Sequence, residues 1–129
     1  MSKFGETINR GKGRIEAEIS EAVIQFEKEY MGRGPLETKT YIIEDMILVR
    51  LKDVLTKAEH QLAQTSDPSE GRELIKKMRG ALLEKGRPLL EAVIKDITGL
   101  TVKSLHTDIS TLTGERVIIF SLEEEASRR

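Results

Sequence analysis

The pattern of apolar residues changes from helical spacing to a strand-like run at one short segment, residues 32–35, which reads Gly-Arg-Gly-Pro. Before it, apolar residues from Ile8 to Tyr30 recur at helical spacing, which predicts a helix with a core-facing stripe. After it, residues 38–52 are rich in β-branched and aliphatic side chains, which predicts strands. Glycine readily ends a helix and proline cannot continue one. The chain must therefore pass from helix to sheet within a few residues, as in an α+β domain.

The first half predicts one long helix followed by a β-hairpin. Gly11 and Gly13 each weaken a helix by about 1 kcal/mol relative to alanine, so we expect firm helix over 14–31 and fraying before it. Glu44 and Asp45 form the only polar break in the strands and predict a tight turn. Pairing about this turn places Tyr41, Ile43, Met46 and Leu48 on one face of the sheet, and Ile42, Ile47, Val49 and Leu51 on the other. Because both faces are apolar, we expect helices on one side and a further layer, such as a second subunit, on the other.

The second half predicts two helices and a second hairpin. Thr56 and Glu59 form a capping box for a short helix ending near Ala63, and Asp67 before a proline begins a long helix that runs to Gly99. Gly86 and Pro88 should bend this helix midway. Its predicted apolar face comprises Leu74, Ile75, Met78, Leu82, Leu89, Val93 and Ile97, widened by Leu90 and Ile94. This face is wider than packing on one sheet face requires, which favours an oligomer.

The predicted fold is a single α+β domain over residues 1–129 with an ordered core at about 14–122. Strands within 100–109 and 116–122, joined at Thr113-Gly114, complete a four-stranded, mainly antiparallel sheet packed on helices. Residues 123–129 carry one apolar residue, Ala126, and predict a solvated tail of acidic and basic residues.

Composition excludes several classes of function. The 129 residues include no cysteine, so disulfides and thiolate metal sites are excluded. A net charge of −1 and the lack of tryptophan argue against a nucleic-acid partner. No segment approaches the roughly 20 apolar residues that cross a bilayer, and no export signal is present. We expect a cytoplasmic protein without direct membrane insertion.

The segment at 32–35 has two possible roles, and the residues leave both open. In the first, Gly32 and Gly34 only allow a sharp exit from the helix, and Arg33 binds the last helical carbonyl groups. In the second, the backbone exposed by the glycines and the Arg33 guanidinium hold an anion or a partner's carboxylate.

Basic residues form a second candidate site on the long helix. Counting 100° per residue places Arg72, Lys76, Arg79 and Arg87 within a stripe of about 80° beside the apolar face. The stripe is an anion site or a contact for an acidic partner, or else a solvated flank whose arginine stems cover the edge of the core.

No catalytic set is recognisable. His106 and Asp108 alternate onto one face of a strand, but no third metal ligand lies near them in sequence. No nucleophile and base can be paired, and no cofactor motif is present. We expect a non-enzymatic protein without a cofactor; an enzyme would instead require His106, Asp108 and Arg79 to converge on one cleft.

The order of short motifs resembles a bacterial family, the MpsC-like or YbcI-like proteins, over residues 14–122. The matching segments are Glu-Tyr-Met-Gly-Arg-Gly-Pro at 29–35, Tyr-Ile-Ile at 41–43, Val-Arg-Leu at 49–51, Leu-Thr-Lys-Ala-Glu at 55–59, Arg79, Thr-Gly at 98–99, Asp108, and Val-Ile-Ile-Phe-Ser-Leu at 117–122. Many relatives carry glycine before the Leu-Thr pair and proline after it, whereas this chain has Asp53 and Lys57. The resemblance carries no catalytic residues over.

The resemblance implies a link to a sodium-translocating, membrane-potential-generating system tied to inorganic-carbon uptake. We therefore expect an accessory or ligand-binding protein, a homodimer, with a membrane-protein partner. The alternatives are an anion-binding regulator or nucleic-acid binder that uses the basic stripe, and a small enzyme with an unrecognised site.

Overall fold

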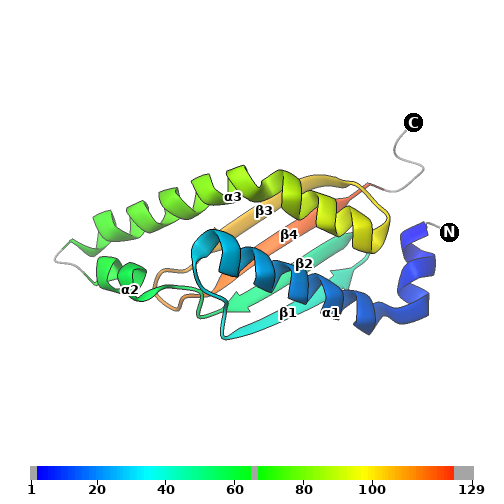
Figure 1. The fold of residues 1–129 in the computed structure, drawn as a ribbon, viewed down its shortest axis with the longest axis horizontal. Coiled ribbons are helices and arrows are strands. Elements are labelled where there is room, and N and C mark those ends of the chain that lie inside the picture. The colour runs from blue at the N-terminus through cyan, green and yellow to red at the C-terminus, as the bar shows by residue number, and fades with distance from the viewer. Residues whose placement is uncertain (1–2, 65–66, 124–129) are drawn as a thin grey trace.

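The computed structural model describes residues 3–64 and 67–123, and it confirms the predicted α+β class. Residues 124–129 of the predicted 123–129 tail lie outside the described residues. A four-stranded antiparallel sheet has the strand order β1-β2-β4-β3, and α1 and α3 lie side by side across one of its faces (Figure 1). The elements are α1 (Lys3–Met31), β1 (Glu37–Ile43), β2 (Met46–Lys52), α2 (Lys57–Ala63), α3 (Pro68–Thr98), β3 (Val102–Ile109) and β4 (Arg116–Leu122).

Helix α1 begins earlier than predicted. Instead of fraying before residue 14, the chain is helical from Lys3, and only Gly11 departs from helical dihedral angles, with φ 163° and ψ 61°. This extended φ at one residue breaks the helix while both flanks stay helical. The segment before Gly11 consequently turns away from the rest of α1 (Figure 1).

The two hairpins form as predicted, but the sheet is covered on one face only. The turn between β1 and β2 lies at Glu44 and Asp45, where Glu44 has a positive φ of 56°. Tyr41 and Ile43 are 41% and 45% exposed, so the second layer expected on that side is not supplied by the described residues. Buried strand residues point toward the helices and form the core with them: Ile42, Ile47, Val49, Leu51, Ile118, Phe120 and Leu122.

Helix α1 also protects the edge strand β1. The Glu16 carboxylate accepts a hydrogen bond from the backbone amide of Ile42 at 2.9 Å, and the hydroxyls of Ser20 and Thr40 lie 2.7 Å apart. An unpaired amide row at a sheet edge can pair with another strand, and the Glu16 contact occupies part of that row.

The helix caps match the predictions. The Thr56 hydroxyl accepts from the Glu59 amide and the Glu59 carboxylate accepts from the Thr56 amide, which completes the capping box of α2. At the start of α3, the Asp67 carboxylate accepts from the Glu70 amide. Gly99 ends α3 in the left-handed region, with φ 79°. These ends are local in sequence, which is why the sequence predicts them well.

The predicted apolar face of α3 is partly wrong. Its helix is continuous across Pro88, and Ile75, Leu83, Leu90 and Ile94 make the buried line. Leu74, Met78 and Leu89, which we assigned to the core face, are about half exposed. Two apolar lines share the helix, and the buried one carries Arg79 in its middle, so counting apolar residues alone merged the two lines into one face.

Helices α1 and α3 approach most closely at Gly86. A Cβ atom placed on Gly86 would lie 2.5 Å from Cε1 of Phe26 and 3.1 Å from Cε2 of Tyr30. The Phe26 and Tyr30 rings stack against each other with centroids 4.7 Å apart. Only a residue without a side chain leaves room for the two rings at this crossing.

Candidate functional site

The centre of the molecule holds a cluster of four buried charges, which we call the buried charge network: Glu27, Glu59, Arg79 and Arg116. Arg79 donates to both carboxylate oxygens of Glu59, from Nε at 2.7 Å and from Nη2 at 2.8 Å. The same guanidinium donates to the Val54 carbonyl at 2.9 Å and to Glu27 Oε1 at 3.3 Å. One arginine of α3 therefore joins α1, α2 and the loop after β2.

Arg116 of β4 completes the network from the sheet. Its Nη1 donates to Glu27 Oε2 at 3.2 Å, and its Nε donates to the Thr107 hydroxyl at 3.2 Å. Each of the four charged residues is at most 4% exposed. Two carboxylates and two guanidinium groups balance in charge, which is the condition under which buried charges are tolerated.

The electrostatics of the network favour the ionised forms of Glu59 and Arg79. Burial by itself would raise the pKa of Glu59, but hydrogen bonds from Arg79 and from the Thr56 amide outweigh it, so the pKa falls below the ordinary value of 4.5. Burial would likewise lower the pKa of Arg79, yet Glu59 and Glu27 raise it. Burial lowers the pKa of Arg116, although the Glu27 carboxylate opposes this effect. The Arg79–Glu59 pair is thus the strongly bound part of the network.

Sequence reasoning missed three of these residues, although each carried a signal. Glu27 follows Ile19 and Val23 at four-residue spacing on the apolar stripe of α1. Arg116 alternates with the buried Ile118 on β4. Glu59 was recognised only as a capping residue. A charged residue at a position whose periodic neighbours are buried indicates an internal ion pair.

A small hollow of about 100 Å³ opens beside the network. Arg79, Arg116, Thr107, Lys76 and Asp108 line it, together with Gly80 and Ile109. Lys76 Nζ lies 3.5 Å from Asp108 Oδ1. His106 is not among the lining residues, so the three groups that an enzyme would need do not meet in this hollow.

Arg33 contacts the loop after β2 and not the end of α1. Its Nη1 donates to the Leu55 carbonyl at 2.6 Å and its Nη2 to Asp53 Oδ2 at 3.1 Å, so the expected bonds to the last helical carbonyls are replaced by a tertiary contact. Gly32 has the predicted positive φ, at 84°. Asp53 also has a positive φ, 54°, a conformation that glycine adopts at lower cost than other residues.

The predicted basic stripe does not form one surface. Arg79 is interior, whereas Arg72 is exposed and Lys76 half-exposed near the start of α3. Arg87 donates from Nε to Glu91 at 2.6 Å and lies 3.6 Å from Glu84. Gly34 packs against the side chain of Lys28, away from these cations. No described contact brings the two candidate sites together.

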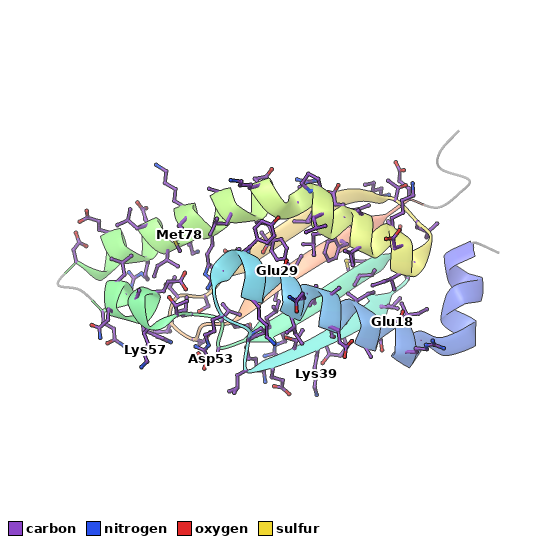
Figure 2. The ribbon with its side chains drawn as sticks, in the orientation of Figure 1. Glu18, Glu29, Lys39, Asp53, Lys57 and Met78 are labelled. Atoms are coloured by element: carbon purple, nitrogen blue, oxygen red, sulfur yellow. The ribbon has the colours of Figure 1, made fainter. Side chains whose placement is uncertain are left out.

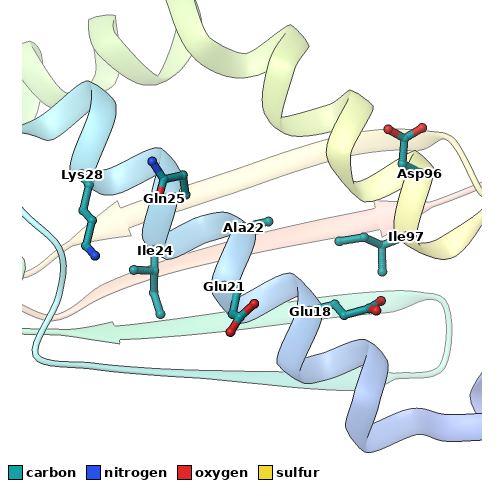
Figure 3. A pocket seen from close by; sticks show the side chains of 8 residues that line it. All are labelled: Glu18, Glu21, Ala22, Ile24, Gln25, Lys28, Asp96 and Ile97. Carbon is teal, nitrogen blue, oxygen red and sulfur yellow. The ribbon is translucent and has the colours of Figure 1, made fainter.

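The largest hollow is a shallow groove of about 790 Å³ along α1 and the end of α3 (Figure 3). Glu18, Glu21 and Asp96 line it with Lys28, and the figure shows these side chains spread along the two helices. Within residues 3–64 and 67–123, no three histidine, aspartate or glutamate side chains are grouped so that they could hold a metal ion.

Two exposed apolar surfaces remain. The first, which we call the outer surface of α3, comprises Leu74, Met78 and Leu89. The second, which we call the open sheet face, lies opposite the helices and comprises Tyr41, Ile43, Met46, Leu48, Val117 and Ile119. Apolar surfaces of this kind are typical of protein contacts.

Comparison with known proteins identifies the family. Residues 11–124 match the sequence profile of the family described as "Na+-translocating membrane potential-generating system (MpsC)". The chain is 47% identical over 115 residues to "Uncharacterized protein YbcI" of Bacillus subtilis (strain 168), covering 89% of this chain and 90% of that protein. No solved structure matches. Across the described part of the chain, no helix has the length and apolar character needed to cross a membrane. With its profile matched over nearly the whole sequence, the chain belongs to the MpsC family.

Proposed function

We propose that this protein is a non-enzymatic, cytoplasmic accessory subunit of a sodium-translocating, membrane-potential-generating system. It acts by binding a protein component of that system through the outer surface of α3. The family description supports the system, and the exposed apolar residues of α3 support the mode of action. The four buried charged residues are paired with one another, which favours binding over catalysis.

The observation that carries the proposal is the exposure of three large apolar residues on one side of α3. Leu74, Met78 and Leu89 fall within about 60° on the helix, counting 100° per residue, and face away from the buried line. Helix surfaces that contact only water are normally polar. A row of half-exposed aliphatic residues on a long helix therefore indicates a contact with another protein.

The charges beside this row define the partner. Lys77 lies beside it and Lys85 within it on the helix, and both are exposed, while Arg79, one of the predicted stripe, is neutralised in the buried charge network. Lys76 adds a further cation near the same end of α3, where Glu70 and Glu73 also lie beside Leu74. The complementary partner surface is apolar, with carboxylates opposite the lysines and a cation opposite the two glutamates.

The test uses a tagged protein expressed at its natural level in cells that encode it, followed by cross-linking and recovery from membranes. We expect a membrane subunit of the system to be recovered with the wild-type protein and to be lost with the double variant Leu74→Glu/Met78→Glu. Leu112→Glu is the matched control, because Leu112 is 92% exposed on a turn outside α3.

Deletion of the gene tests the proposed function in cells. Cells without the protein should show a smaller sodium-dependent membrane potential, restored by the wild-type gene and by Leu112→Glu but not by the double variant. Unchanged membrane potential together with no recovered subunit would overturn the proposal.

A further inference from the structure

The open sheet face supports a proposal that goes beyond the proposed function. We infer that this face packs against the same face of a second copy of the chain, with a two-fold axis parallel to the strands. In that arrangement, Lys39 of each copy faces Asp108 of the other. The outer surface of α3 lies on the opposite side of the molecule and stays free for a partner.

The strand register arranges the open sheet face in rows across the four strands. The first row, beside the β1–β2 turn, is Ile43, Met46, Ser121 and Ser104. The second row is Tyr41, Leu48, Ile119 and His106. The third row is Lys39, Arg50, Val117 and Asp108. Apolar residues therefore fill the centre, and charges of opposite sign lie at the two edges of the third row.

An antiparallel sheet with one face in water normally carries polar residues on that face. Here Leu48 and Ile119 are neighbours at the centre, with Tyr41 and Val117 beside them. Tyr41 and Ile43 remain more than 40% exposed in the single chain. Such a surface gains most by packing on another apolar sheet face, with the sheets about 10 Å apart.

The charges select a second copy in one orientation. A two-fold axis parallel to the strands, between β2 and β4, keeps each row opposite itself and exchanges β1 with β3. Leu48 then packs on Ile119, and Lys39 meets Asp108 twice, because a two-fold interface repeats every contact. Arg50 lies opposite Val117 in this arrangement, with its charge paired to Glu115 of its own chain. An axis across the strands would instead place Lys39 against Ile43 and away from Asp108, so the Lys39 charge would be buried without that partner.

The contacts within one chain leave these charges available. Asp108 is 75% exposed at the side chain; its Oδ1 accepts from the Ile109 amide at 2.8 Å and lies 3.5 Å from Lys76 Nζ, and both contacts leave Oδ2 to face the other copy. Arg50 is occupied by Glu115 at 2.6 Å, and Lys52 lies 3.4 Å from Glu37.

The first experiment measures mass by light scattering and sedimentation over micromolar to 100 µM protein. We expect a dimer for the wild type and a folded monomer for Leu48→Asp, with circular dichroism confirming the fold. Leu112→Asp, at an exposed turn, should remain a dimer. A wild-type monomer throughout, or a dimer that Leu48→Asp leaves intact, overturns the inference and assigns the face to a different occupant.

The second experiment tests the orientation by charge exchange. Lys39→Asp alone and Asp108→Lys alone each place like charges together twice, so each should weaken the dimer by about tenfold or more. The double variant Lys39→Asp/Asp108→Lys restores opposite charges and should recover most of the affinity. Single variants without effect, or a double variant no better than either single one, overturn the pairing. Loss of dimer without loss of the membrane partner would separate this inference from the proposed function.

Discussion

At the scale of single residues, the buried charge network explains why charged side chains occupy core positions on four elements. Replacing a buried ion pair by apolar residues is often harmless, so the network is weak support for high stability. Its geometric effect is clearer, because Arg79 holds Glu59 through two bonds and Val54 through a third. The network fixes where α1, α2 and β4 meet.

Removal of one member should be costly. Arg79→Met leaves the Glu59 carboxylate buried without a cation and leaves Glu27 with Arg116 alone, so we expect the free energy of unfolding to fall by about 3–5 kcal/mol. Urea unfolding followed by circular dichroism measures this change. The matched control is Arg72→Met on the same helix, which is exposed and should change stability by about 0.5 kcal/mol or less. Equal stability of the two variants would contradict the importance of the network.

The lowered pKa of Glu59 gives the protein a pH dependence of known sign. The folded chain binds this proton less readily than the unfolded chain, so the contribution is complete above the ordinary pKa of 4.5 and is lost as the pH falls through the lower folded pKa. Glu59→Gln should therefore flatten the fall in stability between pH 5 and the acid limit of folding. Urea unfolding at a series of pH values measures both slopes, and parallel curves for the two proteins would contradict the assignment.

At the scale of elements, the sequence predicts where helices and turns begin and end better than it predicts which face of a helix is buried. Caps and turns depend on a few adjacent residues, so Thr56, Asp67 and Gly99 could be recognised without the fold. The buried line of α3 could not, because Leu74 and Ile75 are equally apolar and only packing against the sheet and α1 decides between them. Whether α1 kinks at Gly11 similarly depends on whether the residues on both sides of Gly11 stay helical, and the local sequence does not decide this.

The crossing of α1 and α3 supplies a matched pair of glycine substitutions within one helix. Gly80→Ala meets no atom within 4 Å and should raise stability by about 0.5–1 kcal/mol, since alanine favours a helix. Gly86→Ala places Cβ 2.5 Å from Phe26 and should lower stability by about 1–3 kcal/mol despite the same helix preference. Thermal unfolding of both variants checks the difference. A stabilising Gly86→Ala would show that the two helices can separate without cost.

At the scale of the whole molecule, hairpin signals and helix periods were enough to predict the α+β class. The candidate site was far less predictable, because Glu27 and Arg116 are 89 residues apart and meet only after the sheet has formed. Arg33 shows the same limit, since its partners lie in the loop after β2. The sequence shows apolar residues on both faces of the strands, which is more than one layer of helices can cover. Only the strand order shows that those on the open sheet face lie in rows, with charged residues at known positions.

Those rows predict how stability depends on protein concentration. If the open sheet face is covered by a second copy, unfolding releases two chains, so mass action raises the midpoint of thermal unfolding as concentration rises. For two chains of this length we expect a rise of about 2 °C for each tenfold increase in concentration. Leu48→Asp should show a lower midpoint that does not move with concentration, while Leu112→Asp should follow the wild type. A wild-type midpoint that is constant from 1 to 100 µM would mean that the apolar rows are stable in water as a single layer, in conflict with the dimer.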